Sequence, residues 1–198
     1  MRICFFGDSI VNGTGDDDCL GWTGRVCSSA CRAGHDVTHY NLGIRRDTSA
    51  DVRARWRPEA QRRLSPDHNG RLVFAFGGND CVSDCSGGIR VARDEALANT
   101  RAILSEASVW LPTLMIGPSP LSFDGDADER VAVLSRDLEE LCKTIEVPYL
   151  PVFPILTNSE IWSKEAAQGD GTHPNNRGYS TLATIIGEWI AWKRWFSK

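Results

Sequence analysis

A serine, an aspartate and a histidine in this chain have the types and spacing that nucleophilic catalysis needs. Ser9 follows a short apolar run near the N-terminus, and His173 lies three residues after Asp170. A serine hydroxyl becomes a good nucleophile only when a base takes its proton. A carboxylate beside an imidazole base orients the ring and stabilises its cation. These residues therefore predict attack on an acyl carbon by Ser9, with His173 as base and Asp170 orienting it.

Donors for the resulting oxyanion are also present. Attack on an acyl carbonyl produces a negatively charged oxygen, which needs hydrogen-bond donors already in place. We expect three donors: the backbone N–H groups of Ser9 and Gly43, and the side-chain amide of Asn79. Gly43 suits this role because a glycine lets the backbone approach a ligand closely. The expected reaction is acyl transfer to water through an acyl-Ser9 intermediate.

Apolar segments and helical segments alternate along the chain and would position these groups. We expect strands over 2–6, 37–42, 71–76, 109–116 and 147–153, and helices over 22–34, 49–64, 89–107, 127–145 and 174–196. This alternation predicts an α/β fold, a three-layer α/β/α sandwich around a five-stranded parallel sheet. Ligands of such sheets bind beyond the carboxyl ends of the strands, where Ser9, Gly43 and Asn79 are expected.

Four blocks follow the strands or precede the last helix: Gly7-Asp8-Ser9, Asn41-Leu42-Gly43, Gly77-Gly78-Asn79-Asp80 and Asp170-Gly171-Thr172-His173-Pro174. Together, in this order and over almost the whole chain, they resemble the SGNH hydrolase family, also called GDSL-type lipases and esterases. The residues that give the family its name map onto Ser9, Gly43, Asn79 and His173. The resemblance implies a flavodoxin-like fold and a cofactor-free serine esterase, lipase or acylhydrolase that cleaves carboxylic esters.

The second block departs from the family pattern. The family often has a small residue or glycine two or three positions after the block's glycine, where this chain has Arg45 and Arg46. Both arginines could project into solvent, or one could line the cleft and favour an anionic or polar acyl substrate. The candidate substrate-binding residues are Ile10, Arg46, Phe123 and Trp162, and Val82, Leu121 and Phe153 also fall in strand-end loops. We see no lid-like insertion, which favours a small soluble ester as the partner.

Length and composition set the broad class. The chain has 198 residues, 41% of them hydrophobic, and a net charge of −4. We expect one domain over residues 1–198 and exclude a disordered chain. The mild acidity argues against a nucleic-acid partner, which would need a basic face. The longest apolar run is too short to cross a bilayer and no signal peptide is recognisable, so we expect a cytoplasmic protein that binds no membrane.

Seven cysteines raise the question of metals and disulfides. Cys27 and Cys31 are four residues apart, as are Cys81 and Cys85. Zinc sites favour closer pairs, so we expect no metal. In a reducing cytoplasm the thiols act mostly as small buried apolar groups. Cys81 and Cys85 could form a local disulfide if oxidised.

Two other functions share this architecture. A phosphoacceptor receiver domain would need a lysine after the fifth strand, and residues 147–156 contain none. A catalytically silent binding module would have lost Ser9 or His173, and both are present.

The C-terminal helix allows two interpretations. It carries Ile185, Trp189, Trp192 and Phe196 on one stripe. This stripe packs on the sheet in one interpretation. In the other, exposed tryptophans such as Trp195 form the contact of a homodimer.

Overall fold

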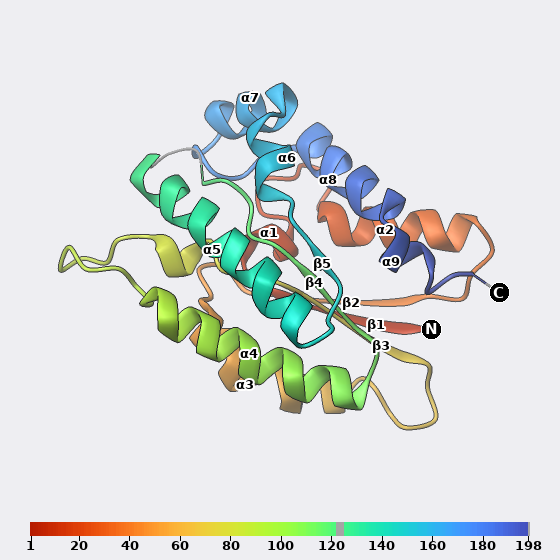
Figure 1. The fold of residues 1–198 in the computed structure, drawn as a ribbon. Coiled ribbons are helices and arrows are strands. Elements are labelled where there is room, and N and C mark those ends of the chain that lie inside the picture. Colours follow the sequence, from red (N-terminus) through yellow and green to blue (C-terminus); the bar gives the residue numbers. More distant parts are fainter. Residues whose placement is uncertain (122–124, 198) are drawn as a thin grey trace.

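The sheet has five parallel strands in the order β2-β1-β3-β4-β5, as the computed structural model of the chain shows (Figure 1). The structure describes residues 1–121 and 125–197. The strands are β1 (Arg2–Gly7), β2 (Thr38–Gly43), β3 (Gly70–Ala75), β4 (Thr113–Ile116) and β5 (Tyr149–Leu150). This confirms the predicted α/β class and the parallel sheet.

Helices cover both faces of the sheet (Figure 1). They are α1 (Ser9–Asn12), α2 (Gly21–Arg32), α3 (Ser49–Gln61), α4 (Arg93–Trp110), α5 (Gly125–Thr144), α6 (Phe153–Thr157), α7 (Glu160–Gln168), α8 (Asn176–Glu188), α9 (Ile190–Lys193) and the 3-10 turn η1 (Asn79–Cys81). Successive side chains of a strand point to opposite faces. Accordingly, Phe6 packs in one apolar core with α3, α4 and α5, and Phe5 packs in a second core with α2, α8 and α9. The three predicted layers are therefore confirmed.

Two predicted strands are shorter than expected. Of the run 109–116, only Thr113–Ile116 is a strand, because α4 continues to Trp110 and leaves Val109 90% exposed. Pro112 disfavours helical geometry in the residue before it, and Leu111 is extended with φ −146° and ψ 155°. The strand predicted over 147–153 keeps only Tyr149–Leu150, and α6 begins at Phe153. The helices α6 and α7 were not predicted.

The C-terminal helix breaks at Trp189, whose ψ of 128° is not helical, so α8 and α9 replace the single predicted helix. Trp192 is only 4% exposed and belongs to the core on that face, with Trp195 and Phe196 packed against it. The packing interpretation thus accounts for the stripe, and the homodimer stays a prediction.

The cysteines are all free in the structure, and Cys81 is buried whereas Cys85 is exposed. Within the described ranges, no cluster of three or more His, Cys, Asp or Glu side chains is arranged to hold a metal ion. Among the described helices, none combines the length and the apolar character that crossing a membrane requires.

Candidate active site

Ser9 lies just beyond the carboxyl end of β1, at the start of the one-turn helix α1. Asp8 caps this helix, and its Oδ1 accepts a hydrogen bond from the N–H of Ile10 at 2.9 Å. Gly7 permits the turn because a Cβ there would lie 1.9 Å from the carbonyl oxygen of Ala75. The strand end therefore holds the Ser9 side chain at the edge of the sheet.

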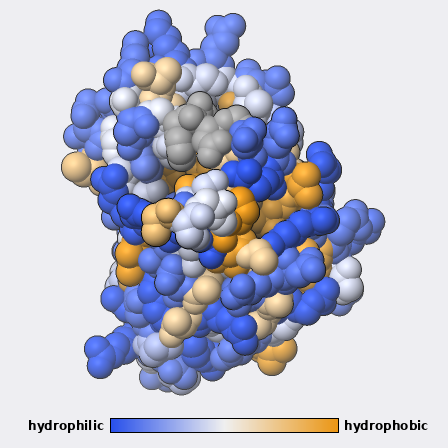
Figure 2. All heavy atoms as spheres, turned by 90° about the vertical axis from the view of Figure 1, so that its left-hand side faces the viewer, coloured by the Kyte–Doolittle hydropathy of each residue, from blue (hydrophilic) through white to orange (hydrophobic). Residues whose placement is uncertain are grey.

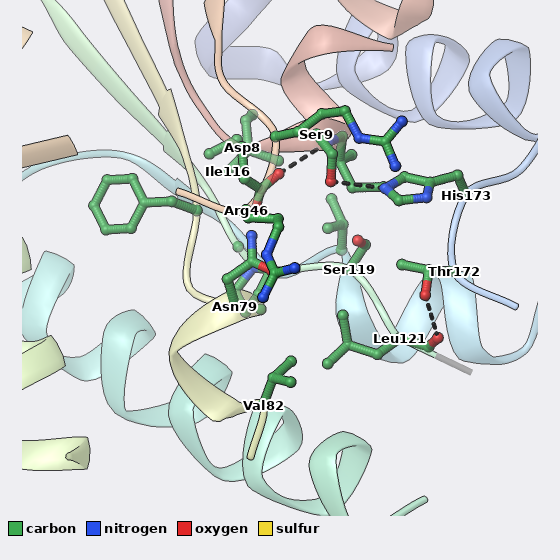
Figure 3. A pocket seen from close by; sticks show the side chains of 18 of the residues that line it. Asp8, Ser9, Arg46, Asn79, Val82, Ile116, Ser119, Leu121, Thr172 and His173 are labelled. Atoms are coloured by element: carbon green, nitrogen blue, oxygen red, sulfur yellow. Dashed lines mark hydrogen bonds between the residues drawn. The ribbon is translucent and has the colours of Figure 1, made fainter. Parts of the chain in front are cut away.

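His173 reaches Ser9 from the segment that precedes α8. Its Nε2 lies 2.7 Å from the Oγ of Ser9 (Figure 3). Its Nδ1 lies 2.6 Å from the Oδ2 of Asp170, and its backbone N–H donates to Oδ1 of the same carboxylate at 3.0 Å. The structure thus brings the three predicted catalytic residues into one continuous line of hydrogen bonds.

The two aspartates nearest Ser9 have opposite electrostatics. Burial alone would raise the pKa of Asp170, but hydrogen bonds from His173 and from the N–H of Thr172 lower it to about 2. Asp170 is therefore a fixed negative charge at neutral pH, as the partner of an imidazolium must be. Burial raises the pKa of Asp8 to about 7, against the lowering effect of the bond from Ile10. Asp8 is thus a buried carboxyl group that titrates near neutral pH.

Two of the three predicted oxyanion donors lie beside Ser9. The N–H of Ser9 itself is in the first turn of α1, where backbone donors have no partner within the helix. Asn79 lines the same pocket as Ser9, and its amide nitrogen donates to the carbonyl oxygen of Asp47 at 3.0 Å. An amide carries two N–H groups, so this bond orients the side chain and leaves one N–H for a ligand.

The Gly43 donor is used elsewhere. Its N–H donates to the Oδ1 of Asn41 at 3.0 Å, and Gly43 is not among the described residues that line the pocket. A Cβ at Gly43 would lie 2.2 Å from the backbone nitrogen of Asn12. The glycine is thus required because α1 packs directly on the end of β2, and this geometry does not support the predicted oxyanion role.

Arg46 has a left-handed backbone conformation, which glycine adopts more readily than other residues. It lies in a turn closed by a hydrogen bond from the N–H of Asp47 to the carbonyl oxygen of Ile44, and its φ is +72°. Such a φ is uncommon for a residue with a side chain. The guanidinium of Arg90 donates to the carbonyl oxygen of Arg46 at 2.8 Å and holds the turn. Within the described residues, no hydrogen bond uses the N–H of Arg46.

Asp80 supports this side of the pocket from below. It is 1% exposed, and its Oδ1 accepts a hydrogen bond from the N–H of Ser49 at 2.8 Å. Burial raises its pKa to about 6, although the bonds from Ser49 act in the opposite direction. Asp80 therefore ties the start of α3 to the turn that carries Asn79.

A cavity of about 300 Å³ opens above Ser9. Figure 2 faces the side of the molecule that lies at the left in Figure 1, where apolar side chains show between mostly hydrophilic ones. Of the residues proposed for substrate binding, the cavity is lined by Ile10, Arg46, Val82 and Leu121. Such a volume is at the lower end for ligand pockets and suits a small substrate.

Two candidates, Trp162 and Phe153, are not among the described residues that line the cavity. Trp162 is fully buried and packs edge-on to Tyr179 at 6.2 Å between ring centres, so it stabilises the core under α7 and α8. Phe153 begins α6 and packs against the other core. The candidate Phe123 lies outside the described residues.

Several lining residues were missed by sequence reasoning. Ser119 follows β4 and lines the cavity, so the same strand-end rule applied to Gly117-Pro118-Ser119 would have found it. Thr172 also lines it, and its hydroxyl donates to the carbonyl oxygen of Leu121 at 3.2 Å. Arg90 carries no such signal, because it reaches the site through a loop bridged between Ser83 and Ile89.

A comparison with known protein families identifies the family of this chain. The model of the GDSL-like Lipase/Acylhydrolase family matches residues 5–180. No curated protein sequence matched the chain.

Solved structures show the same fold. A member of the lipolytic protein G-D-S-L family from Veillonella parvula is 20% identical, with 96% of this chain and 98% of that chain covered and a TM-score of 0.77. TesA is 22% identical, with coverages of 98% and 99% and a TM-score of 0.75. A catalytic mutant of Axe2, an acetylxylan esterase from Geobacillus stearothermophilus, is 16% identical, with coverages of 96% and 95% and a TM-score of 0.74.

Proposed function

This chain belongs to the GDSL-like lipase/acylhydrolase family, and from that premise we propose that it hydrolyses carboxylic esters through an acyl-Ser9 intermediate. One observation carries the proposal: the unbroken line from the Ser9 hydroxyl through both ring nitrogens of His173 to Asp170. An imidazole that contacts a serine hydroxyl on one side and a charged carboxylate on the other is arranged to take the hydroxyl proton.

In the first half of the proposed reaction, Ser9 attacks the ester carbonyl while its proton moves to Nε2 of His173. The resulting imidazolium donates from Nδ1 to Asp170, which is charged throughout the neutral range. The imidazolium then gives its proton to the departing alcohol oxygen, and the acyl group stays on Ser9. In the second half, His173 activates a water that releases the acid.

The oxyanion would be held by the N–H of Ser9 and the free amide N–H of Asn79. The sequence assigned a third donor to Gly43, whose N–H donates to Asn41 in the structure. We propose that the N–H of Arg46 takes this place, since Arg46 lines the cavity and its N–H has no partner among the described groups. Donors fixed before the reaction stabilise the developing charge without having to reorganise.

A small ester is the proposed substrate, because the cavity has only about 300 Å³. Its apolar lining includes Trp22, Ile116 and Leu182, which suits a short acyl chain. No step of the proposed mechanism uses a metal or an organic cofactor.

Hydrolysis of p-nitrophenyl acetate by the wild type, the Ser9→Ala variant and the Ser105→Ala variant tests the proposal. Ser105 is an exposed residue of α4 and controls for the loss of a hydroxyl. We expect turnover by the wild type and by Ser105→Ala, and none above background by Ser9→Ala. Absence of turnover from the wild type on this and longer acyl esters would favour a silent binding module. Unchanged turnover by Ser9→Ala would refute the mechanism.

A further inference from the structure

Two guanidinium groups at the cavity have no partner among the described residues. Arg45 and Arg46 both line it, both are exposed, and neither side chain takes part in a described hydrogen bond or ion pair. Figure 3 shows Arg46 among the side chains that line the cavity, together with Asn79, one of the proposed oxyanion donors. The two side chains are therefore available to a ligand that enters the cavity.

Three other arginines of the chain bind carboxylates. Arg25 binds the carboxylate of Asp16 with two nitrogens, and Arg93 binds both carboxylate oxygens of Asp137. Arg55 lies next to the turn that carries Arg45 and Arg46, and its Nε donates to Asp47 at 2.6 Å. The carboxylate nearest to the turn in sequence is thus taken by another cation.

The backbone of the turn is fixed by bonds from outside it. Arg90 donates to the carbonyl oxygen of Arg46, and Asn79 donates to that of Asp47. The φ of +72° at Arg46 is a strained conformation that persists only where the surroundings hold it. Such residues cluster at ligand sites, and here the strained residue lines the same cavity as Asn79.

The carboxylates on the opposite side of the cavity do not neutralise these cations. Asp170 is not among the described residues that line the cavity, and its carboxylate already accepts hydrogen bonds from the backbone of Thr172 and His173. Asp8 is buried, and its pKa is raised to about 7, so much of it is uncharged at neutral pH. The described lining of the cavity thus carries three guanidinium groups, those of Arg45, Arg46 and Arg90, but only one carboxyl group, in a protein whose net charge is −4.

We propose that Arg45 and Arg46 bind an anionic group, a carboxylate or a phosphate, carried by the ester that Ser9 cleaves. Guanidinium groups recognise both anions through paired N–H donors. The inference rests on the proposed function, because it names the substrate class of the same site. It makes the two arginines specificity-determining residues and leaves the chemistry to Ser9 and His173.

Matched esters test this inference. We compare kcat/KM for para-acetoxybenzoate and para-acetoxyphenyl phosphate with that for neutral para-acetoxybenzamide, which has the same acetyl group and ring. In a second series the charge lies on the acyl part: monoethyl glutarate, which has a free carboxylate, is compared with the analogue in which an amide replaces that carboxylate. We expect the charged member to be preferred by about tenfold or more in at least one series, since hydrogen bonds to charged groups are stronger than those between neutral groups. The series that shows the preference tells whether the anionic group belongs to the acyl part or to the alcohol part of the ester, and the preferred compound tells whether it is a carboxylate or a phosphate.

Variants assign the preference to the arginines. Arg45→Gln combined with Arg46→Gly removes both cations, and the glycine fits the positive φ. We expect the ratio of charged to neutral kcat/KM to fall close to one in this double variant. Arg101→Gln removes an exposed charge on α4 and should leave the ratio unchanged. A wild-type ratio near one in both series, or a preference that survives in the double variant, would overturn the inference.

Binding to the Ser9→Ala protein separates the two proposals. Its Kd for the preferred charged ester should be about tenfold or more below that for the neutral analogue, and high salt should reduce the difference. If this protein shows the difference while the wild type hydrolyses no ester, the proposed function fails and the anion site stands. If the wild type hydrolyses neutral and charged esters equally and binding shows no difference, the proposed function stands and the anion site fails.

Discussion

The two sides of the cavity differ in how their polar groups are used. On the side of α8, Ser9, His173 and Asp170 form a closed series in which each reacting group contacts the next at 2.6–2.7 Å. On the side of β2, Arg90 and Asn79 hold the turn at Arg45 and Arg46 from outside, and neither of its guanidinium groups has a hydrogen-bond or ion-pair partner within residues 1–121 and 125–197. One side is arranged to move a proton, and the other to receive negative charge.

This contrast shows how one fold separates reactivity from selectivity. The side of α8 needs fixed geometry, because a displacement of the imidazole by about 1 Å weakens its hydrogen bond to the hydroxyl and can lower the rate about 10²-fold. The side of β2 needs hydrogen-bond donors that are free to bind the ligand. Such donors keep a fixed position only if other atoms of the same residues are hydrogen-bonded to the protein. The turn achieves this through its carbonyl groups, which leaves N–H and guanidinium groups available.

Breaking the closed side should have the largest effect. We expect Ser9→Ala and His173→Ala each to lower kcat by at least about 10⁴-fold, and the double variant to lose little more, because the two residues act as one unit. The measurement is steady-state hydrolysis of p-nitrophenyl acetate, with circular dichroism to check the fold. Losses that multiply in the double variant would show that the two residues act independently.

Asp170→Asn should weaken the closed side less. It removes the charge that stabilises the imidazolium and leaves a side chain of similar shape, so we expect kcat to fall between about 10² and 10⁴-fold. The pKa of Asp170 is lowered to about 2, so the wild-type carboxylate is ionised across the assay range from pH 5 to 9. A pH profile of the wild type should therefore show no ionisation of Asp170 in that range. A loss as large as that of Ser9→Ala would contradict a purely supporting role.

Asn79→Ala tests the receiving side. It removes a proposed oxyanion donor together with the hydrogen bond to Asp47, and we expect kcat to fall about 10²–10³-fold with a smaller change in KM. An Asn79→Asp variant, of similar size but with a negative charge beside the oxyanion, should be at least as impaired. An effect on KM alone would place Asn79 in ground-state binding.

The smallest expected effect concerns stability and pH at Asp8. Its pKa is raised to about 7 in the folded protein, whereas an unfolded aspartate titrates near 3.9. Between these values the folded state holds more protons, so the contribution of Asp8 to stability decreases as pH rises and is constant above about 7. Asp8→Asn keeps a helix-capping side chain and removes the charge.

We therefore expect the stability of Asp8→Asn, relative to the wild type, to increase from pH 4 to pH 7 by up to a few kcal/mol. Urea unfolding of both proteins at several pH values measures this difference, and subtraction removes the contributions of other carboxylates. A difference that is flat with pH would show that Asp8 titrates normally.

The closed side was predictable from sequence and the receiving side only in part. Ser9 follows a strand directly, and Asp170 and His173 lie three residues apart in one turn, so local spacing fixes their relation. Predicting the oxyanion donors requires knowing which N–H groups of a turn are free to face the cavity. This depends on hydrogen bonds within the folded protein. Asn41 takes the N–H of Gly43, a contact that no spacing rule reports.

The secondary structure, too, could be predicted from the sequence only in part. Buried strands such as β1 were predicted within one residue, because a continuous apolar run marks them. The run 109–116 was assigned wholly to a strand, since composition alone does not separate the last turn of α4 from β4. Trp162 was placed in the pocket because it follows the fifth strand, yet α7 turns it into the core.

Labelling with a fluorophosphonate tests the central claim, that His173 activates Ser9 as the nucleophile, most directly. An activated serine attacks the phosphorus, fluoride leaves, and the phosphonyl group stays on the serine oxygen. We predict one group per chain by intact-protein mass spectrometry, located on Ser9 by peptide mapping, with labelling at least about 10³-fold slower in His173→Ala. Ester hydrolysis by a protein that is labelled on another residue, or labelling of Ser9 at the same rate in His173→Ala, would contradict the account.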